Sequence, residues 1–102
     1  MRFDPSAELD AVEAQRIIRE IINNGVLIIS RHAKTRMVER GYTTHDIEHI
    51  LLHGSITKKE INTHTNNWVY TVRGFDLEGD EGGVVAAISC LKESIVITVL
   101  SR

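Results

Sequence analysis

Three side chains that suit phosphate chemistry recur at every fourth position near the middle of the chain. His32, Arg36 and Arg40 share one edge if this segment is helical, because one turn of an α-helix takes about 3.6 residues. Arginine binds phosphate oxygens through paired N–H groups, and histidine can accept or donate a proton near neutral pH. Glu39 lies beside the two like charges and offsets part of their repulsion. The spacing favours an anion-binding edge, and a solvated helix face is the alternative.

Metal-free cleavage of RNA needs side chains of these types. A base removes the 2′ proton, cations stabilise the charge that develops on the phosphate, and an acid protonates the leaving 5′ oxygen. His32 is the candidate acid or base, and the arginines clamp the phosphate. The candidate catalytic residues are His32, Arg36, Arg40 and Arg73, and the candidate substrate contacts are Lys59 and Tyr70. Tyr70 is the weakest of these candidates, because strand alternation places it on the core side.

Other chemistry has little support in the sequence. Histidines at 45, 49 and 53 also repeat every four residues, but no paired cysteine completes a metal site, so a solvated face is favoured. The Gly79–Gly83 turn lacks the lysine of a nucleotide-binding loop, and no serine elbow is present. The single cysteine, Cys90, lies in an apolar run and is expected to be buried. We therefore predict neither a metal nor a cofactor.

Composition limits the class of protein. The 102 residues correspond to one domain, 1–102, and the net charge of −2 argues against strong non-specific binding to nucleic acid. The charge is uneven, since residues 31–73 hold seven Lys/Arg, four Asp/Glu and all five histidines. One cysteine fits a reducing compartment, and no segment has the length of a membrane span. We expect a cytoplasmic protein that does not contact membranes.

Hydrophobic periodicity predicts where these residues sit. Helices are expected over 7–22 with Ser6 as N-cap, over 31–40, and from a capping box at Thr43–Asp46 to about His53, with a short extended run at 26–29. Four strands follow, at 55–64, 68–75, 84–90 and 94–100. The prediction is an α+β domain, with a helical part (6–54) on one face of a four-stranded antiparallel sheet (55–100). Alternation leaves Thr71, Arg73, Thr98 and Arg102 on the open face.

One stretch also resembles a known family. The core Ser30-Arg31-His32-Ala33-x-x-Arg36-Met37-x-x-Arg40-Gly41-Tyr42, followed by Asp46-Ile47 and Gly54, is similar to a bacterial family annotated only as a domain of unknown function. The similarity extends over about residues 26–100. Members resemble the MqsR and RelE type toxins, which are mRNA interferases with helices against an antiparallel sheet and a paired antitoxin. The resemblance implies a toxin-like, metal-independent endoribonuclease with RNA as substrate and an antitoxin as partner.

The MqsR pattern is matched only in part. Gly25, Gly41, Gly54 and the aromatic strand at Trp68 have counterparts, whereas Val69 stands where a glutamine is expected. Catalysis in this chain then rests on the His32–Arg40 line and Arg73. Two alternatives stay open: a non-catalytic module that binds RNA or an acidic protein, and a structural role in which Arg36 and Arg40 pair with nearby acids. The sequence does not predict an oligomeric state.

Overall fold

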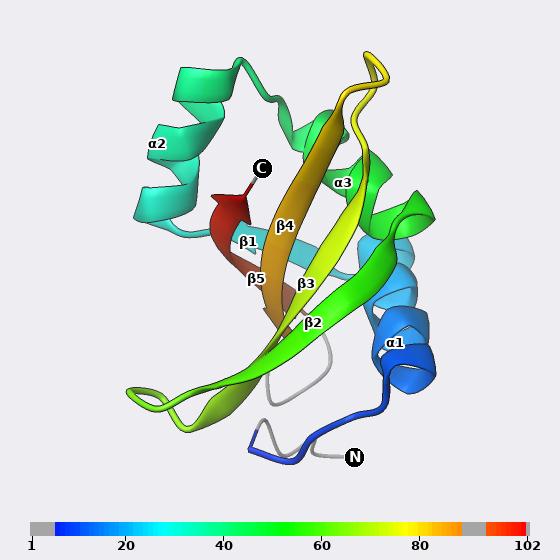
Figure 1. Ribbon diagram of the computed structural model, residues 1–102, viewed down its shortest axis with the longest axis vertical. Coiled ribbons are helices and arrows are strands. Elements are labelled where there is room, and N and C mark those ends of the chain that lie inside the picture. The colour runs from blue at the N-terminus through cyan, green and yellow to red at the C-terminus, as the bar shows by residue number, and fades with distance from the viewer. Residues whose placement is uncertain (1–5, 89–93, 102) are drawn as a thin grey trace.

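The computed structural model describes residues 6–88 and 94–101, which form three helices and five strands (Figure 1). In chain order they are α1 (Ala11–Asn24), β1 (Val26–Ile29), α2 (Arg31–Arg40), α3 (Thr44–His53), β2 (Ser55–Asn62), β3 (Asn67–Phe75), β4 (Glu81–Ile88) and β5 (Ser94–Ser101). The predicted α+β class is confirmed.

The sheet has five strands rather than the predicted four. Its order is β1-β5-β4-β3-β2, and successive strands from β2 to β5 pair antiparallel. The additional strand is the short apolar run Val26–Ile29, which pairs parallel with β5. The short length of this run predicted an extended segment. Its partner strand could not be predicted in the same way, because β5 lies at the far end of the chain. A parallel neighbour of this kind requires a long crossover, which α2, α3 and the remaining strands supply.

Local signals fix the two short helices as predicted. Ser30 caps α2 by accepting from the N–H of Ala33, and Gly41 ends it in the left-handed conformation at φ 69°. The capping box at Thr43 and Asp46 opens α3. The first helix differs from its prediction, because Asp10 rather than Ser6 caps it and α1 runs from Ala11 to Asn24. A carboxylate one residue before the helix accepts the N–H of Glu13, which the more distant Ser6 does not reach.

The core lies between the helices and one face of the sheet. Tyr70 and Val72 of β3 are each 1% exposed on that face, whereas Thr71 and Arg73 are only partly covered on the other, as strand alternation predicted. The helical contribution comes mainly from apolar residues of α1 and α3: Ala14, Ile17, Ile18, Ile21, Ile47, Ile50 and Leu51. Predicted strand ends shift by a few residues, since β2 ends at Asn62 and β4 starts at Glu81. Cys90, Arg102 and the side chain of Thr98 lie outside the described residues.

The second helix differs from the other two. Figure 1 shows α2 set apart from α1 and α3, and it packs chiefly along β5. Ala33 is its only fully buried residue, with Met37 partly buried against the core. An element that buries so little contributes little apolar stabilisation, so most of its surface is available for other contacts. No helix in the described ranges is long and apolar enough to cross a membrane.

Candidate functional site

The exposed surface of α2 is basic. Arg31, His32 and Lys34 are exposed, and Arg36 and Arg40 are half-buried beside the inward stripe of Ala33 and Met37. Four Lys/Arg against one glutamate give this ten-residue helix a formal charge of +3. One guanidinium nitrogen of each half-buried arginine, Nε of Arg36 and one Nη of Arg40, is buried. The structure thus places the predicted line of His32, Arg36 and Arg40 on one helix.

Arg36 has an unusual environment. Its Nε atom is buried and, within the described part of the chain, makes no hydrogen bond. The closest carboxylate oxygen is Oε2 of Glu39 at 3.8 Å, which is an ion pair without hydrogen-bond geometry. This contact gives partial support to the structural alternative, in which Arg36 pairs with an acid. Because the contact has no hydrogen-bond geometry, the Arg36 Nε–H remains a cationic donor without an acceptor among the described residues.

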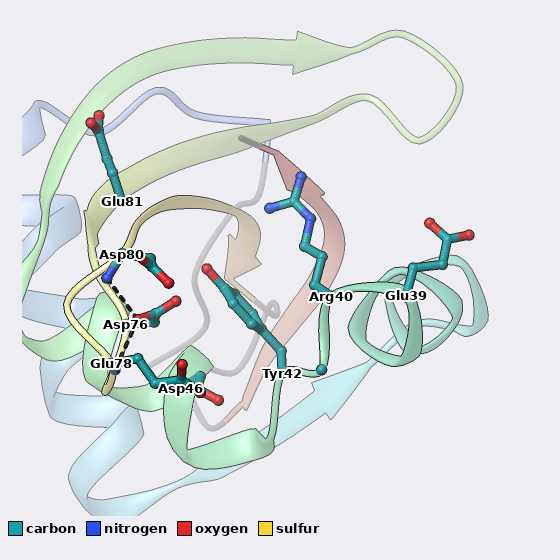
Figure 2. A pocket seen from close by; sticks show the side chains of 9 residues that line it. Glu39, Arg40, Tyr42, Asp46, Asp76, Glu78, Asp80 and Glu81 are labelled. Carbon is teal, nitrogen blue, oxygen red and sulfur yellow. Dashed lines mark hydrogen bonds between the residues drawn. The ribbon is translucent and has the colours of Figure 1, made fainter.

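Arg40 faces a pocket of about 460 Å³ at the junction of α2, α3 and the turn between β3 and β4. Figure 2 shows the ring of Tyr42 between Arg40 and that turn, with Glu39 directed away. The pocket is lined by Glu39, Arg40, Gly41, Tyr42, Asp46, Asp76, Glu78, Asp80 and Glu81. Because most of the residues that line the pocket carry carboxylates, the electrostatic potential of the pocket disfavours a bound anion and favours a cationic group.

Two of these carboxylates hold the backbone together. Asp76 Oδ1 accepts the N–H groups of Glu78 and Asp80, each at 2.9 Å (Figure 2). Asp46 Oδ1 accepts the N–H of Leu77 at 3.1 Å, while its Oδ2 accepts the N–H of Thr43 at 2.9 Å. These hydrogen bonds lower the pKa of Asp46 below its ordinary range, with the Thr43 backbone as the largest cause. The turn is therefore fastened to the start of α3.

Tyr42 is a site residue that sequence reasoning did not single out. Burial raises the pKa of its hydroxyl above 10.0, and the charge and hydrogen bond of Asp76 add to that rise, while Arg40 opposes it. The phenol therefore stays protonated at neutral pH and can donate. Its hydroxyl occupies the space that a Cβ on Gly82 of β4 would fill. The available signal was its place directly after Gly41, together with a glycine pair in the facing strand.

Arg73 lies near the pocket but not on α2. It projects from β3, and its Nε is 3.9 Å from Oε1 of Glu81, one of the pocket carboxylates. Its side chain is 30% exposed. Arg73 therefore borders the same region as Arg40 through Glu81, and its assigned contact with a phosphate stays a prediction.

Lys59 and Tyr70 lie away from this region. The Tyr70 hydroxyl accepts the N–H of Leu9 at 3.1 Å, and Lys59 Nζ donates to the Leu9 carbonyl at 3.2 Å. Lys59 also pairs with Glu8 at 2.7 Å, which is the largest cause of its raised pKa. Trp68 Nε1 donates to the Ser6 carbonyl at 3.1 Å. These contacts fasten the segment before α1 to the sheet, so the structure does not bring Lys59 and Tyr70 together with α2.

The histidines of α3 form no cluster of metal ligands. His45 is exposed and lies 3.5 Å from Glu48, and the rings of His49 and His53 have centroids 4.7 Å apart. Over the residues that the structure covers, no group of three or more potential ligands is close enough to hold a metal ion. A structural or catalytic site needs at least a third donor, and the described residues supply none beside this pair.

Comparison with known proteins gives one match. The model of a family described as a domain of unknown function, DUF4258, matches residues 29–101. The matched range includes α2, α3, the pocket and strands β2 to β5, and it leaves out the segment before α1 and α1 itself. Comparison with curated proteins found no match, and comparison with solved structures found none either.

Proposed function

Because the chain belongs to the DUF4258 family of domains of unknown function, whose description states no activity, we propose from its own geometry that it binds RNA along α2. The observation that carries the proposal is that α2 buries only Ala33 fully and presents four Lys/Arg and a histidine on the remainder of its surface. A short basic helix that packs on a protein through a narrow stripe can contact successive phosphates of a nucleic-acid backbone with the rest of its surface.

The distribution of charge suggests a path for the RNA. Arg31 and Lys34 are exposed and do not line the pocket. Arg40, in contrast, lines it, and Arg36 pairs with one of its carboxylates, Glu39. A phosphate placed in the pocket is repelled by several acids at short range. The RNA backbone is therefore expected to follow the exposed side of α2 and to stay outside the pocket.

A titration of fluorescently labelled single-stranded RNA tests this proposal. Arg31→Gln, Lys34→Gln and Arg36→Gln are combined in one variant, and anisotropy is followed at several salt concentrations. Loss of three phosphate contacts should weaken binding strongly and reduce the salt slope by about 0.7 per contact, the value for single strands.

Lys58→Gln is the matched control, since Lys58 is 63% exposed on β2 and its loss removes the same type of charge elsewhere. A loss of binding free energy in the control of about one third of that in the triple variant, that is an equal loss per charge removed, would show that net charge, and not α2, governs binding. No binding by the parent protein at low salt would reject RNA as the ligand.

Metal-independent endoribonuclease activity is the second candidate. It is favoured by His32 and Arg36, which lie one turn apart on the same helix. The resemblance to MqsR and RelE type toxins supports the same activity, with an antitoxin as partner. In this scheme His32 is the acid or base, and Arg36 and Arg40 hold the phosphate, whereas Tyr42 lies at the other end of α2, too far from His32 to act on the same phosphate.

Cleavage is tested with end-labelled RNA in the presence of EDTA. His32→Ala should reduce cleavage by at least about a hundredfold, the usual contribution of a general acid or base, while RNA affinity falls little, and Tyr42→Phe should leave cleavage unchanged. Intact RNA with the parent protein, at concentrations that saturate binding, would leave the binding module as the function. In a bacterial host, mRNA loss that His32→Ala relieves would extend the result to a toxin.

A further inference from the structure

The two edges of the sheet differ in how well they are protected from pairing with another chain. One edge is β2, which carries Lys58, Lys59 and Glu60 and has an irregular register between Ile56 and Lys58. Charged side chains and irregularities of this kind are the usual defences of an exposed edge strand. The β2 edge is therefore unsuited to regular pairing.

The other edge is β1, and it has neither defence. Its four residues, Val26–Ile29, are all apolar, and its pairing with β5 is regular throughout. The side chains of Val26 and Ile28 point to the open face of the sheet and are 58% and 45% exposed. An uncharged, regular edge strand with exposed β-branched side chains is a surface on which a further strand can add.

The backbone of β1 shows which groups are available. Ser30 donates its N–H to the carbonyl of Ile97 on β5, and alternation along the strand directs Ile28 toward β5 as well. The N–H and C=O groups of Leu27 and Ile29 therefore point away from the sheet. Within the described part of the chain, no hydrogen bond reaches these outward groups. Unpaired groups on a strand edge are the acceptors and donors that strand addition uses.

We propose that β1 pairs with β1 of a second copy of this chain, antiparallel and about a two-fold axis at Ile28. In this register Leu27 lies opposite Ile29 of the second copy, and Ile29 lies opposite its Leu27. Both are hydrogen-bonded pairs, so the outward groups of the two chains satisfy one another. The two Ile28 residues form the non-hydrogen-bonded pair between them, where side chains approach most closely.

Self-complementarity is the reason for choosing a second copy as the occupant. A two-fold axis requires that, where residue i of one copy contacts residue j of the other, residue j of the first copy contacts residue i of the second. Leu27 and Ile29, whose backbone groups point outward on either side of Ile28, fulfil this condition. The segment is uncharged, so no repulsion opposes its approach to an identical segment. Since four residues bury little area, we expect a weak dimer with a dissociation constant on the order of 100 μM.

Sedimentation velocity over a range of about 10 to 500 μM tests the proposal, because that range brackets the expected constant. The parent protein should shift from monomer to dimer with concentration. Ile28→Lys places two like charges opposite each other and should raise the dissociation constant by about tenfold. Ile61→Lys is the matched control, since Ile61 is 44% exposed on the other edge strand, and its dimerisation should equal that of the parent.

Disulfide trapping tests the register separately and does not depend on the lysine variant being folded. Ile28→Cys should give a covalent dimer on mild oxidation, because a non-hydrogen-bonded antiparallel pair has the Cα separation that a disulfide needs. Val26→Cys should not, since the two copies of residue 26 are then four positions apart along the strands. The parent protein, with Cys90 alone, shows how much dimer the native thiol gives.

Three results would overturn the proposal. One is a monomer throughout the concentration range. Another is a dimer that Ile28→Lys leaves unchanged while circular dichroism shows a folded chain. The third is crosslinking of Val26→Cys as fast as Ile28→Cys, which indicates a different register or a different partner surface.

Discussion

The hydroxyl of Tyr42 occupies the space beside Gly82 that a methyl group on residue 82 would fill. Tyr42 follows α2, and Gly82 belongs to β4, so this contact joins the end of the basic helix to the sheet. It also holds the ring in the position where Asp76 and Arg40 reach the hydroxyl. The absence of a side chain at residue 82 is therefore a condition for the geometry of the pocket.

Gly82→Ala is expected to lower the free energy of unfolding by about 1–3 kcal/mol, because the added methyl displaces the Tyr42 ring. Urea denaturation monitored by circular dichroism measures the change. In a Tyr42→Phe background the hydroxyl is gone, and the same alanine should have a smaller effect. Equal effects in the two backgrounds would show that Tyr42 is not the group that the methyl meets.

Asp46→Asn is expected to lower the free energy of unfolding at pH 7 by about 1–2 kcal/mol, because the amide replaces one of the two acceptor oxygens that bind Thr43 and Leu77. The pKa of Asp46 in the folded chain lies below its ordinary 3.8. Its stabilisation is therefore complete above pH 3.8 and is lost as the pH falls through the lower, folded value.

The difference in stability between parent and Asp46→Asn should accordingly be largest at neutral pH and shrink below pH 3.8. Urea midpoints at a series of pH values measure it. Asp10→Asn is a suitable comparison, since Asp10 caps α1 through one oxygen only, and asparagine is an equally good cap. A difference for Asp46→Asn that stays constant into acid would contradict the assignment.

Tyr70→Phe removes the acceptor of the Leu9 N–H and should lower the free energy of unfolding by about 1 kcal/mol. Proteolysis in the segment before α1 should become faster, because Tyr70 fastens that segment to β3. RNA affinity should be unchanged, since Tyr70 is 1% exposed and lies away from α2. Weaker RNA binding at unaltered stability would instead support its assignment as a substrate contact.

Gly41→Ala is expected to destabilise the chain by about 1–2 kcal/mol, although nothing lies within 4 Å of the position that a Cβ would take. The cause is the φ of 69°, which ends α2 in the left-handed conformation. Gly41→Asn should have a clearly smaller effect, because asparagine tolerates this conformation best among residues with a side chain. Thermal unfolding of the two variants makes the comparison, and equal losses would point to a steric cause.

Features set by neighbouring residues could be predicted from the sequence. The bounds of α2 follow from Ser30 and Gly41, and the start of α3 follows from Thr43 and Asp46. Each signal acts within one helical turn, so it needs no knowledge of the rest of the fold. Membership in a family of unknown function was likewise predicted from the short core around His32 and is confirmed over residues 29–101. The likeness to toxins stays a prediction.

Features set by distant segments were decided only by the tertiary structure. The sequence of Val26–Ile29 predicts an apolar, extended run. Its parallel pairing with β5 depends on where the C-terminal strand lies in the folded chain. The contacts of Lys59 and Tyr70 with Leu9 join segments that lie far apart in the chain, and the assignment of both residues as substrate contacts stays a prediction. Tyr42 belongs to the site because Gly82 of β4 and Asp76 of the turn between β3 and β4 lie beside its hydroxyl. Helix caps and hydrophobic periodicity depend on residues a few positions apart, so the sequence alone predicts them. Contacts across the sheet depend on the register of segments that meet only in the folded chain.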